Sequence, residues 1–296
     1  MNILDHLNIP SPITKIETSW SKESQVSISL KRDDLIHPLI SGNKWRKLSG
    51  ILSHYKAESY DEIVTYGGAF SNHLVATAVV CSILGKSSVG IIRGEEPKEI
   101  NGTLKLCNTY GMKLQYVTRP EYKETNRTLG VIDRKLMIPE GGACDLGTAG
   151  CQQILAECDL TTYDHILVSC GTGTTIAGMA QYLQSKSIGA SILKGVQVLK
   201  GEGYISNELQ DLYGIQNVTI LDQFHCGGYA KTNKELITFI RDFATDTGVL
   251  LDPIYTGKMM FAIQKKVNEG TISKGEKVLA VHTGGLTGWF GKHKEL

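Results

Sequence analysis

The residue with the clearest chemical potential is a lysine in the stretch Ser41–Leu48, which has the sequence SGNKWRKL. Gly42 and Asn43 are typical of a turn and a helix N-cap. Apolar residues then recur at helical spacing: Trp45, Leu48, Ile51, Leu52 and Tyr55. Lys44 falls on this apolar stripe, whereas Arg46 falls on the opposite side of the predicted helix. Because a buried ammonium is costly unless it is paired, neutralised or covalently used, Lys44 is either a lysine that reaches water from a frayed first turn or a reactive amine in a pocket.

A second candidate is the glycine-rich stretch Cys170–Gly178, CGTGTTIAG, which follows a strand-like segment and opens a predicted helix. Glycines let the backbone approach a ligand, and the N–H groups at a helix N-terminus favour an anion. The stretch is not a Walker A loop, because no Gly-Lys-Ser/Thr follows. It predicts either a tight turn without a ligand or a phosphate site. The residues of that site would be Gly171, Thr172, Gly173, Thr174 and Thr175.

Polar side chains also follow a buried strand that ends near Tyr66. The next residues, Gly67–His73, have the sequence GGAFSNH and place a hydroxyl, an amide and an imidazole after a glycine turn. One of Ser71 and Asn72 is expected to cap the following helix. Two capping residues and a histidine exceed what one cap needs, so the segment is either a simple helix start or a ligand-binding turn.

Two tyrosines and a threonine lie in similar turns. Tyr229 lies in the stretch GGYAKTN, and Tyr255 lies at the loop-to-helix junction DPIYTGK. Each is either a core tyrosine with a satisfied hydroxyl or part of a site. Thr283 follows the last strand-like segment in HTGG and either caps the chain that follows or reaches a ligand ring.

The elements that must position these residues alternate between strand-like and helix-like segments, which is typical of parallel α/β sheets with right-handed crossovers. Ligands of such sheets bind beyond the carboxyl ends of the strands. Four strand-like segments end in glycine-rich turns, after Tyr66, Ile138, Cys170 and His282. Residues 1–26 are expected to be irregular, and Asp145–Cys158 is expected to form one helix.

The composition predicts a globular cytoplasmic protein. Hydrophobic residues make up 41% of the 296 residues, and 31 basic residues nearly balance 30 acidic ones, so neither a nucleic-acid nor a membrane partner is expected. We find no signal-peptide pattern and no apolar run long enough to span a bilayer. The seven cysteines contain no Cys-x-x-Cys pair, so no metal site is expected, and reduced thiols fit the cytoplasm.

Taken together, these stretches resemble the pyridoxal-phosphate enzymes of the tryptophan-synthase-β-like fold (fold type II), and more closely the ACC (1-aminocyclopropane-1-carboxylate) deaminase/D-cysteine desulfhydrase family. The resemblance extends from about Lys31 to Gly291 and rests on seven ordered stretches. They are Lys31–Asp34, Ser41–Leu48, Gly67–His73, Gly171–Gly178, Tyr229–Asn233, Asp252–Lys258 and His282–Gly285.

The resemblance implies a role for each candidate residue. Lys44 would form the Schiff base with pyridoxal 5'-phosphate and, once freed, would serve as the base for the α-proton. Asn72 would bind the cofactor's 3-hydroxyl, the Gly171–Thr175 loop its phosphate, and Thr283 its pyridine nitrogen. The catalytic and substrate-side residues would be Ser71, Asn72, His73, Gly142, Tyr229 and Tyr255, with Ser71 near the substrate carboxylate.

The resemblance also implies the fold and the reaction. The fold would be two α/β domains, each an open, mostly parallel sheet flanked by helices, with the cofactor in the cleft between them. The large domain would comprise residues 1–46 and 158–296, and the small domain 47–157. A homodimer is implied by the family, and the only other partner expected is a small amino-acid substrate.

One residue bears on the substrate. ACC deaminases carry a glutamate after the tyrosine of the Asp-Pro-x-Tyr motif, and here that position is Thr256, as in the desulfhydrase branch. The favoured reaction is therefore β-elimination from D-cysteine to pyruvate, hydrogen sulfide and ammonia. The alternatives are ACC deamination to 2-oxobutyrate, elimination from D-serine or cysteate and, in another class, a non-catalytic protein that binds a phosphate ligand.

Overall fold

The chain divides into two compact units in the computed structural model, which describes residues 2–40, 42–125 and 128–292. Unit 1 comprises Met1–Ile9 and Ile36–Gly150, and unit 2 comprises Pro10–Leu35 and Cys151–Leu296. Each unit has its own sheet, which confirms the predicted α/β class. Ser41, the first residue of the lysine stretch, lies outside the described residues.

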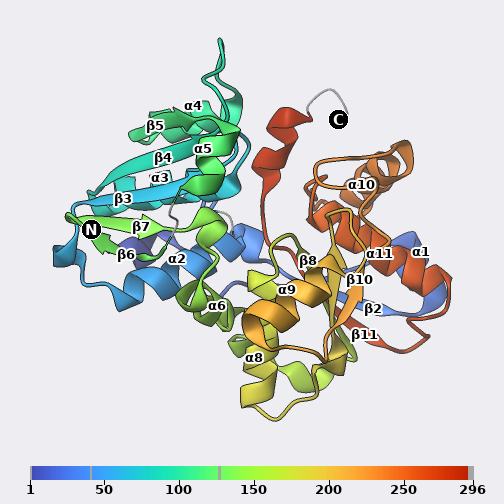
Figure 1. Cartoon of the computed structure of the whole chain (residues 1–296). Coiled ribbons are helices and arrows are strands. Elements are labelled where there is room, and N and C mark those ends of the chain that lie inside the picture. The colour runs from blue at the N-terminus through green and yellow to red at the C-terminus, as the bar shows by residue number, and fades with distance from the viewer. Residues whose placement is uncertain (1, 41, 126–127, 293–296) are drawn as a thin grey trace. The chain divides into compact units, whose positions relative to one another are not determined.

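Unit 1 is built on a five-stranded sheet in the order β5-β4-β3-β7-β6, and only β6 runs antiparallel to its neighbour (Figure 1). Its strands are β3 (Glu62–Gly67), β4 (Ser87–Arg93), β5 (Met112–Val117), β6 (Gly130–Ile132) and β7 (Lys135–Ile138). Its helices are α2 (Gly42–His54), α3 (Asn72–Leu84), α4 (Gly102–Thr109), α5 (Arg119–Glu124) and the start of α6 (Asp145–Cys151). Short 3-10 segments are η1 (Ile3–His6), η3 (Ala57–Ser59) and η4 (Glu140–Gly142). Helix α3 is buried from His73 to Cys81, as expected for a helix without a polar face.

Unit 2 is built on a six-stranded sheet in the order β1-β2-β11-β8-β9-β10, and only β1 runs antiparallel to its neighbour (Figure 1). Its strands are β1 (Ile13–Ile16), β2 (Ser27–Lys31), β8 (His165–Cys170), β9 (Leu193–Gln197), β10 (Thr219–Leu221) and β11 (Lys277–Val281). Its helices are α1 (Ser19–Ser24), α7 (Gln153–Ala156), α8 (Thr174–Ser185), α9 (Tyr204–Tyr213), α10 (Lys234–Thr247) and α11 (Thr256–Asn268). Short 3-10 segments are η2 (Asp33–Leu35), η5 (Leu160–Thr162), η6 (Ala190–Ile192) and η7 (Leu286–Gly291).

The central strands of unit 2 are buried on both faces. Along β11, Val278 and Ala280 join the core that contains α10 and α11, whereas Leu279 and Val281 join the core that contains α8 and α9. Side chains alternate between the two faces of a strand, so a continuous apolar run belongs to a strand covered on both sides. This burial leaves the carboxyl ends of the strands as the places where polar residues gather.

The division into units differs from the predicted domains at several points. Helix α2 packs Trp45, Leu48 and Ile51 into the core of unit 1, so Lys44 belongs to the smaller unit and not to the larger one. The first nine residues also belong to unit 1. The predicted helix Asp145–Cys158 is broken between α6 and α7 at Gln152.

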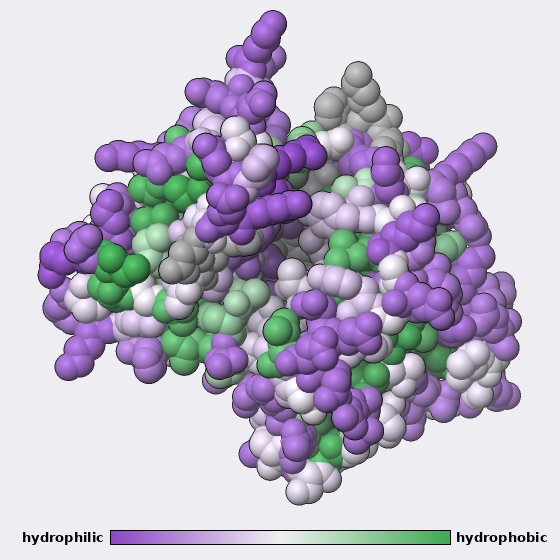
Figure 2. All heavy atoms as spheres, in the orientation of Figure 1, coloured by the Kyte–Doolittle hydropathy of each residue, from purple (hydrophilic) through white to green (hydrophobic). Residues whose placement is uncertain are grey.

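The sequence reading also missed β1 and α1 in the segment expected to be irregular, and α9 further along. The sequence also predicts a helix over residues 121–129; α5 covers the start of that range, and residues 126–127 lie outside the described residues. On the face shown in Figure 2, hydrophilic residues cover most of each unit, and apolar residues form separate groups. Of the helices in the described ranges, none has the length and apolar character that crossing a bilayer requires.

Candidate active site

Lys44 is the third residue of α2 and is half-buried. The predicted apolar stripe of this helix is confirmed at Trp45, Leu48 and Ile51, each of which is at most 5% exposed. Lys44 therefore lies in the first turn of α2, and the apolar residues that follow it pack the helix against the core of unit 1. Such a position holds the side chain while leaving part of it accessible.

Arg46, predicted on the opposite side of the helix from this stripe, is also buried, with only 2% of its surface exposed. Helix α2 packs on a second side against α6, where glycines allow the two backbones to touch. A Cβ atom on Gly150 would lie 2.0 Å from the Arg46 carbonyl oxygen, and one on Gly50 would lie 2.1 Å from that of Leu146. The helical stripe predicted one buried face, whereas the fold buries two.

The turn after β3 presents Ser71 at the start of α3. Ser71 occupies the N-cap position, but its hydroxyl makes no capping hydrogen bond. A Cβ atom on Gly67 would lie 2.8 Å from both Cβ and Oγ of Ser71, so glycine is required for this close turn. The Asn101 side chain donates to the Ala69 carbonyl oxygen at 2.9 Å and fixes the turn from outside. Ser71 is thus held in place, half-buried, with its hydroxyl not used by the helix.

His73, two residues later, turns its imidazole into the interior of unit 1. The Thr65 hydroxyl donates to the Ile138 carbonyl oxygen at 2.9 Å, so its one proton is committed. The His73 Nε2, 2.8 Å from Thr65 Oγ1, must therefore be the donor of that bond. Burial, with added effects from the charges of Lys44 and Lys47, holds the pKa of His73 well below its usual range. The imidazole is neutral, and substrate contact by this side chain stays a prediction.

Gly142 lies beside His73 in the turn that follows β7. Its φ of +66° is in the left-handed region. A Cβ atom there would lie 3.2 Å from Lys47 Cβ and 3.6 Å from His73 Cε1. The buried Lys47 amine donates to the Gly141 carbonyl oxygen at 3.2 Å, which ties α2 to this turn. Unit 1 therefore brings His73 and Gly142 together near the start of the lysine helix.

In unit 2, the predicted phosphate loop lies between β8 and α8. Gly173 is the N-cap of α8 and has a φ of +77°, which favours glycine. Thr174 and Thr175 begin the helix and are buried, whereas Thr172 is exposed, with its Oγ1 3.3 Å from Thr174 Oγ1. The first N–H groups of any α-helix lack intrahelical acceptors. The aligned peptide dipoles of the 12 residues of α8 add a partial positive charge at the same end of the helix. The loop has the chemistry of an anion site.

Tyr255 and Tyr229 meet beside this loop. Their ring centroids are 6.2 Å apart in an edge-to-face arrangement. A Cβ atom on Gly171 would lie 3.2 Å from Tyr255 Cε1, so the ring packs directly on the loop backbone. Tyr229 is 47% exposed and is therefore not a core tyrosine.

The position of Tyr255 is fixed by a carboxylate at the start of α11. Asp252 accepts hydrogen bonds from the backbone N–H groups of Ile254, Tyr255 and Thr256 at 2.7–2.9 Å. The Thr256 hydroxyl also donates to Asp252, at 2.7 Å, and is fully buried. Thr256 thus completes a local cap, a role that explains a polar residue at this position without a ligand.

Thr283 follows β11 and is 5% exposed. The preceding residue, His282, holds the turn: its Nε2 donates to the Leu250 carbonyl oxygen at 3.0 Å, and its Nδ1 accepts from the Gly284 N–H at 3.2 Å. Sequence reasoning did not single out His282 or Thr65, since the signal for each is a partner far away in the chain.

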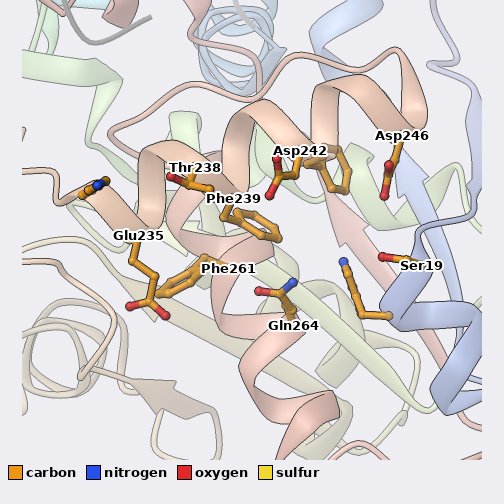
Figure 3. A pocket seen from close by; sticks show the side chains of 11 residues that line it. Ser19, Glu235, Thr238, Phe239, Asp242, Asp246, Phe261 and Gln264 are labelled. Atoms are coloured by element: carbon orange, nitrogen blue, oxygen red, sulfur yellow. The ribbon is translucent and has the colours of Figure 1, made fainter.

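A groove elsewhere in unit 2 has a volume of about 550 Å³ and is formed by α1, α10 and α11 (Figure 3). Figure 3 shows Glu235 and Asp242 on the side of the groove where the rings of Phe239 and Phe261 lie, and Asp246 farther along, toward Ser19. Its lining includes none of the predicted site residues. Within the described ranges, we also find no cluster of three or more histidine, cysteine or acidic residues suited to a metal ion.

Comparison with known proteins places these features in a family context. The family described as "Pyridoxal-phosphate dependent enzyme" matches residues 5–284. The bifunctional D-cysteine desulfhydrase/1-aminocyclopropane-1-carboxylate deaminase of Arabidopsis thaliana is 29% identical over 96% of this chain and 78% of its own length. The D-cysteine desulfhydrase of Klebsiella pneumoniae is 29% identical over 99% of this chain and 97% of its own. The crystal structure of an ACC deaminase homologue superposes with a TM-score of 0.79 at 28% identity, over 98% of this chain and 94% of that one.

Proposed function

Because this chain belongs to the pyridoxal-phosphate dependent enzymes, we propose that it is the lyase that eliminates the β-substituent of D-cysteine. Two features support the proposal: a half-buried lysine in the first turn of α2 in unit 1, and a glycine-rich loop suited to an anion at the start of α8 in unit 2. A protein that only bound a phosphate ligand would use the loop but would have no use for the amine.

The residues present fit the cofactor. Lys44 offers a primary amine for its aldehyde, and the Gly171–Thr175 loop offers the backbone N–H groups that a phosphate needs. Gly171 leaves room for the Tyr255 ring, and the side chain of a larger residue at position 171 would occupy that space. We assign Asn72 to the 3-hydroxyl and Thr283 to the pyridine nitrogen.

The bound cofactor supplies an electron sink for the carbanion that forms at the substrate Cα. Lys44 Nζ takes the Cα proton as a general base. Ser71 donates its uncommitted hydroxyl to the substrate carboxylate, and Tyr229 and Tyr255 enclose the side chain and exclude water. The Cβ–S bond then breaks and its electron pair leaves with sulfur. With one water consumed, D-cysteine gives pyruvate, ammonia and hydrogen sulfide.

The choice of D-cysteine rests on Thr256 and Thr283. Neither is a carboxylate, and the Thr256 hydroxyl is already bound to Asp252. A hydroxyl at the ring nitrogen does not hold a full pyridinium, so the electron sink is weaker than with an acidic partner. Rapid loss of a good leaving group from Cβ suits a weak sink better than opening a cyclopropane ring does.

The test is a panel of five substrates with cofactor-loaded protein: D-cysteine, L-cysteine, D-serine, cysteate and ACC. We expect pyruvate from D-cysteine, lost in Lys44→Ala and retained in the matched surface variant Lys56→Ala. Formation of 2-oxobutyrate from ACC would support ACC deamination, an activity that the name of the Arabidopsis relative includes, and would refute the inference from Thr256. If none of the five substrates gave a 2-oxo acid, the substrate assignment would be refuted.

We further propose that the enzyme acts as a homodimer in the cytoplasm. None of the seven cysteines, all of which lie in the described residues, forms a disulfide, which fits a reducing compartment. Light scattering of the purified protein at micromolar concentration tests the dimer, and a monomeric mass would refute it.

A further inference from the structure

Lys258 is a buried lysine that the proposed reaction does not use. It is the third residue of α11 and has no exposed surface. Its Nζ donates to two backbone carbonyl oxygens, of His225 at 2.8 Å and of Gly228 at 2.9 Å. A buried ammonium is costly unless it is hydrogen-bonded, so the pairing with this one loop requires an explanation.

The loop that Lys258 binds has an unusual backbone. Cys226, Gly227, Gly228 and Ala230 all have positive φ, between 53° and 122°. Two of these residues are not glycine, so the conformation is strained and must be held by its surroundings. The loop's own hydrogen bonds, such as Lys231 N–H to the Gly228 carbonyl oxygen at 3.1 Å, span only a few residues.

The strained loop carries Tyr229. The Gly228 carbonyl that accepts from Lys258 immediately precedes this residue, and the Tyr229 ring meets Tyr255 three positions before Lys258. The same helix start therefore fixes both tyrosines, Tyr255 through Asp252 and Tyr229 through the Lys258 amine. At the other end, the Asn233 side chain caps α10 by accepting from Leu236 N–H at 2.8 Å.

We propose that Lys258 is a positioning residue that holds the His225 and Gly228 carbonyls together and so keeps Tyr229 against Tyr255 at the substrate. The inference rests on the proposed function, in which Tyr229 encloses the substrate. Lys258 itself touches neither substrate nor cofactor. Without its two hydrogen bonds, the left-handed residues relax and the exposed Tyr229 ring leaves its partner.

The electrostatic surroundings leave the amine protonated at neutral pH. Burial lowers the pKa of Lys258 to about 8. Cys226 in the loop and Asp252 before α11 act in the opposite direction, and Lys292 adds to the lowering. At pH 7 the amine still carries its proton, so both carbonyls receive charge-assisted hydrogen bonds.

The test compares Lys258→Met with the matched control Lys265→Met. Lys265 lies on the same helix, but its amine contacts the exposed Glu235 and the ring of Phe261, both of which lie outside the loop. Amide hydrogen exchange of the cofactor-loaded proteins at pH 6.5 reads the loop directly, through the bonded N–H groups of Gly227, Gly228 and Lys231. Lys258→Gln, whose amide reaches one carbonyl, provides a graded variant should the Met variant fail to fold.

We expect faster exchange confined to residues 222–233 in the Lys258 variants, and a KM for D-cysteine raised about tenfold with kcat within about twofold. The control should match the unaltered enzyme in both. Unchanged exchange, or faster exchange with unchanged KM, overturns the positioning role. If the unaltered enzyme turns over no D-cysteine, the proposed function fails, and the exchange result alone decides whether Lys258 holds the loop.

Discussion

The turn between β3 and α3 in unit 1 and the turn between β8 and α8 in unit 2 share a plan and differ in what they present. Each follows a buried parallel strand and opens a helix of 12 or 13 residues. In the first, the N-cap is Ser71 with extended backbone, held against Gly67. In the second, the N-cap is Gly173 in the left-handed region.

The difference lies in which atoms each turn makes available. The extended N-cap in unit 1 projects a hydroxyl and, one residue later, an amide side chain. The left-handed glycine in unit 2 places no side chain at the N-cap position, so this turn presents the backbone N–H groups at the N-terminus of α8. The first suits polar groups of a substrate, and the second suits a phosphate. Two similar sequence patterns therefore predict two different ligand chemistries.

The largest effect is expected from Gly173→Val. A β-branched residue does not adopt a φ of +77° without strain, so the loop moves and its N–H groups no longer converge. We expect the cofactor dissociation constant to rise about thirtyfold, measured by fluorescence titration. Gly130→Ala is the control, since a Cβ atom there meets nothing within 4 Å. Unaltered cofactor affinity in Gly173→Val would show that the loop does not hold the phosphate.

Gly67→Ala should produce a smaller effect of a different kind. The new methyl group would collide with Ser71, because its position lies only 2.8 Å from Cβ and Oγ of that residue. We expect the KM for D-cysteine to rise about fivefold while cofactor affinity stays within about twofold. Steady-state kinetics and the same titration separate the two effects. If Gly67→Ala lost cofactor affinity as strongly as Gly173→Val does, the two turns would not differ in the ligand that they bind.

The smallest effect concerns His73, beside the first turn. Burial lowers its pKa in the folded state, whereas the unfolded chain has a value of about 6.5. Below that pH the unfolded state takes up a proton that the folded state does not, so stability falls as pH falls. The unfolding free energy should drop by up to about 1.4 kcal/mol per pH unit from this group.

Urea unfolding between pH 7 and 5.5 measures this slope. His73→Gln lacks the titrating group, so its stability should fall less steeply than that of the unaltered enzyme. Parallel slopes for the two proteins would show that His73 titrates alike in the folded and unfolded states, and would contradict the lowered pKa of the buried imidazole.

Local patterns were sufficient for some features of the fold. The glycine-rich turns after β3, β7, β8 and β11 were predicted because strand and turn signals are carried by neighbouring residues. The loop at α8 follows from the same signals, whereas the sequence left open whether Tyr229 is buried or exposed. The roles of Lys44 and the other predicted site residues stay predictions.

Other features depend on contacts between distant residues. Arg46 is buried because Gly150, about a hundred positions later, lets α6 approach α2. The neutral state of His73 depends on Thr65 and on the Ile138 carbonyl of another strand. The hydrogen-bond partner of the buried Lys258 amine lies in a loop 30 residues earlier. No periodicity within one segment contains this information.

The most direct test of the account is the location of the cofactor on the chain. Borohydride reduction of the loaded enzyme, followed by digestion and mass spectrometry, identifies the modified lysine. We predict a phosphopyridoxyl group on Lys44, and a loss of D-cysteine turnover of about a thousandfold or more in Lys44→Ala. A modified Lys47, or a Lys44→Ala enzyme that keeps its turnover, would contradict the assignment of Lys44 as the reactive amine.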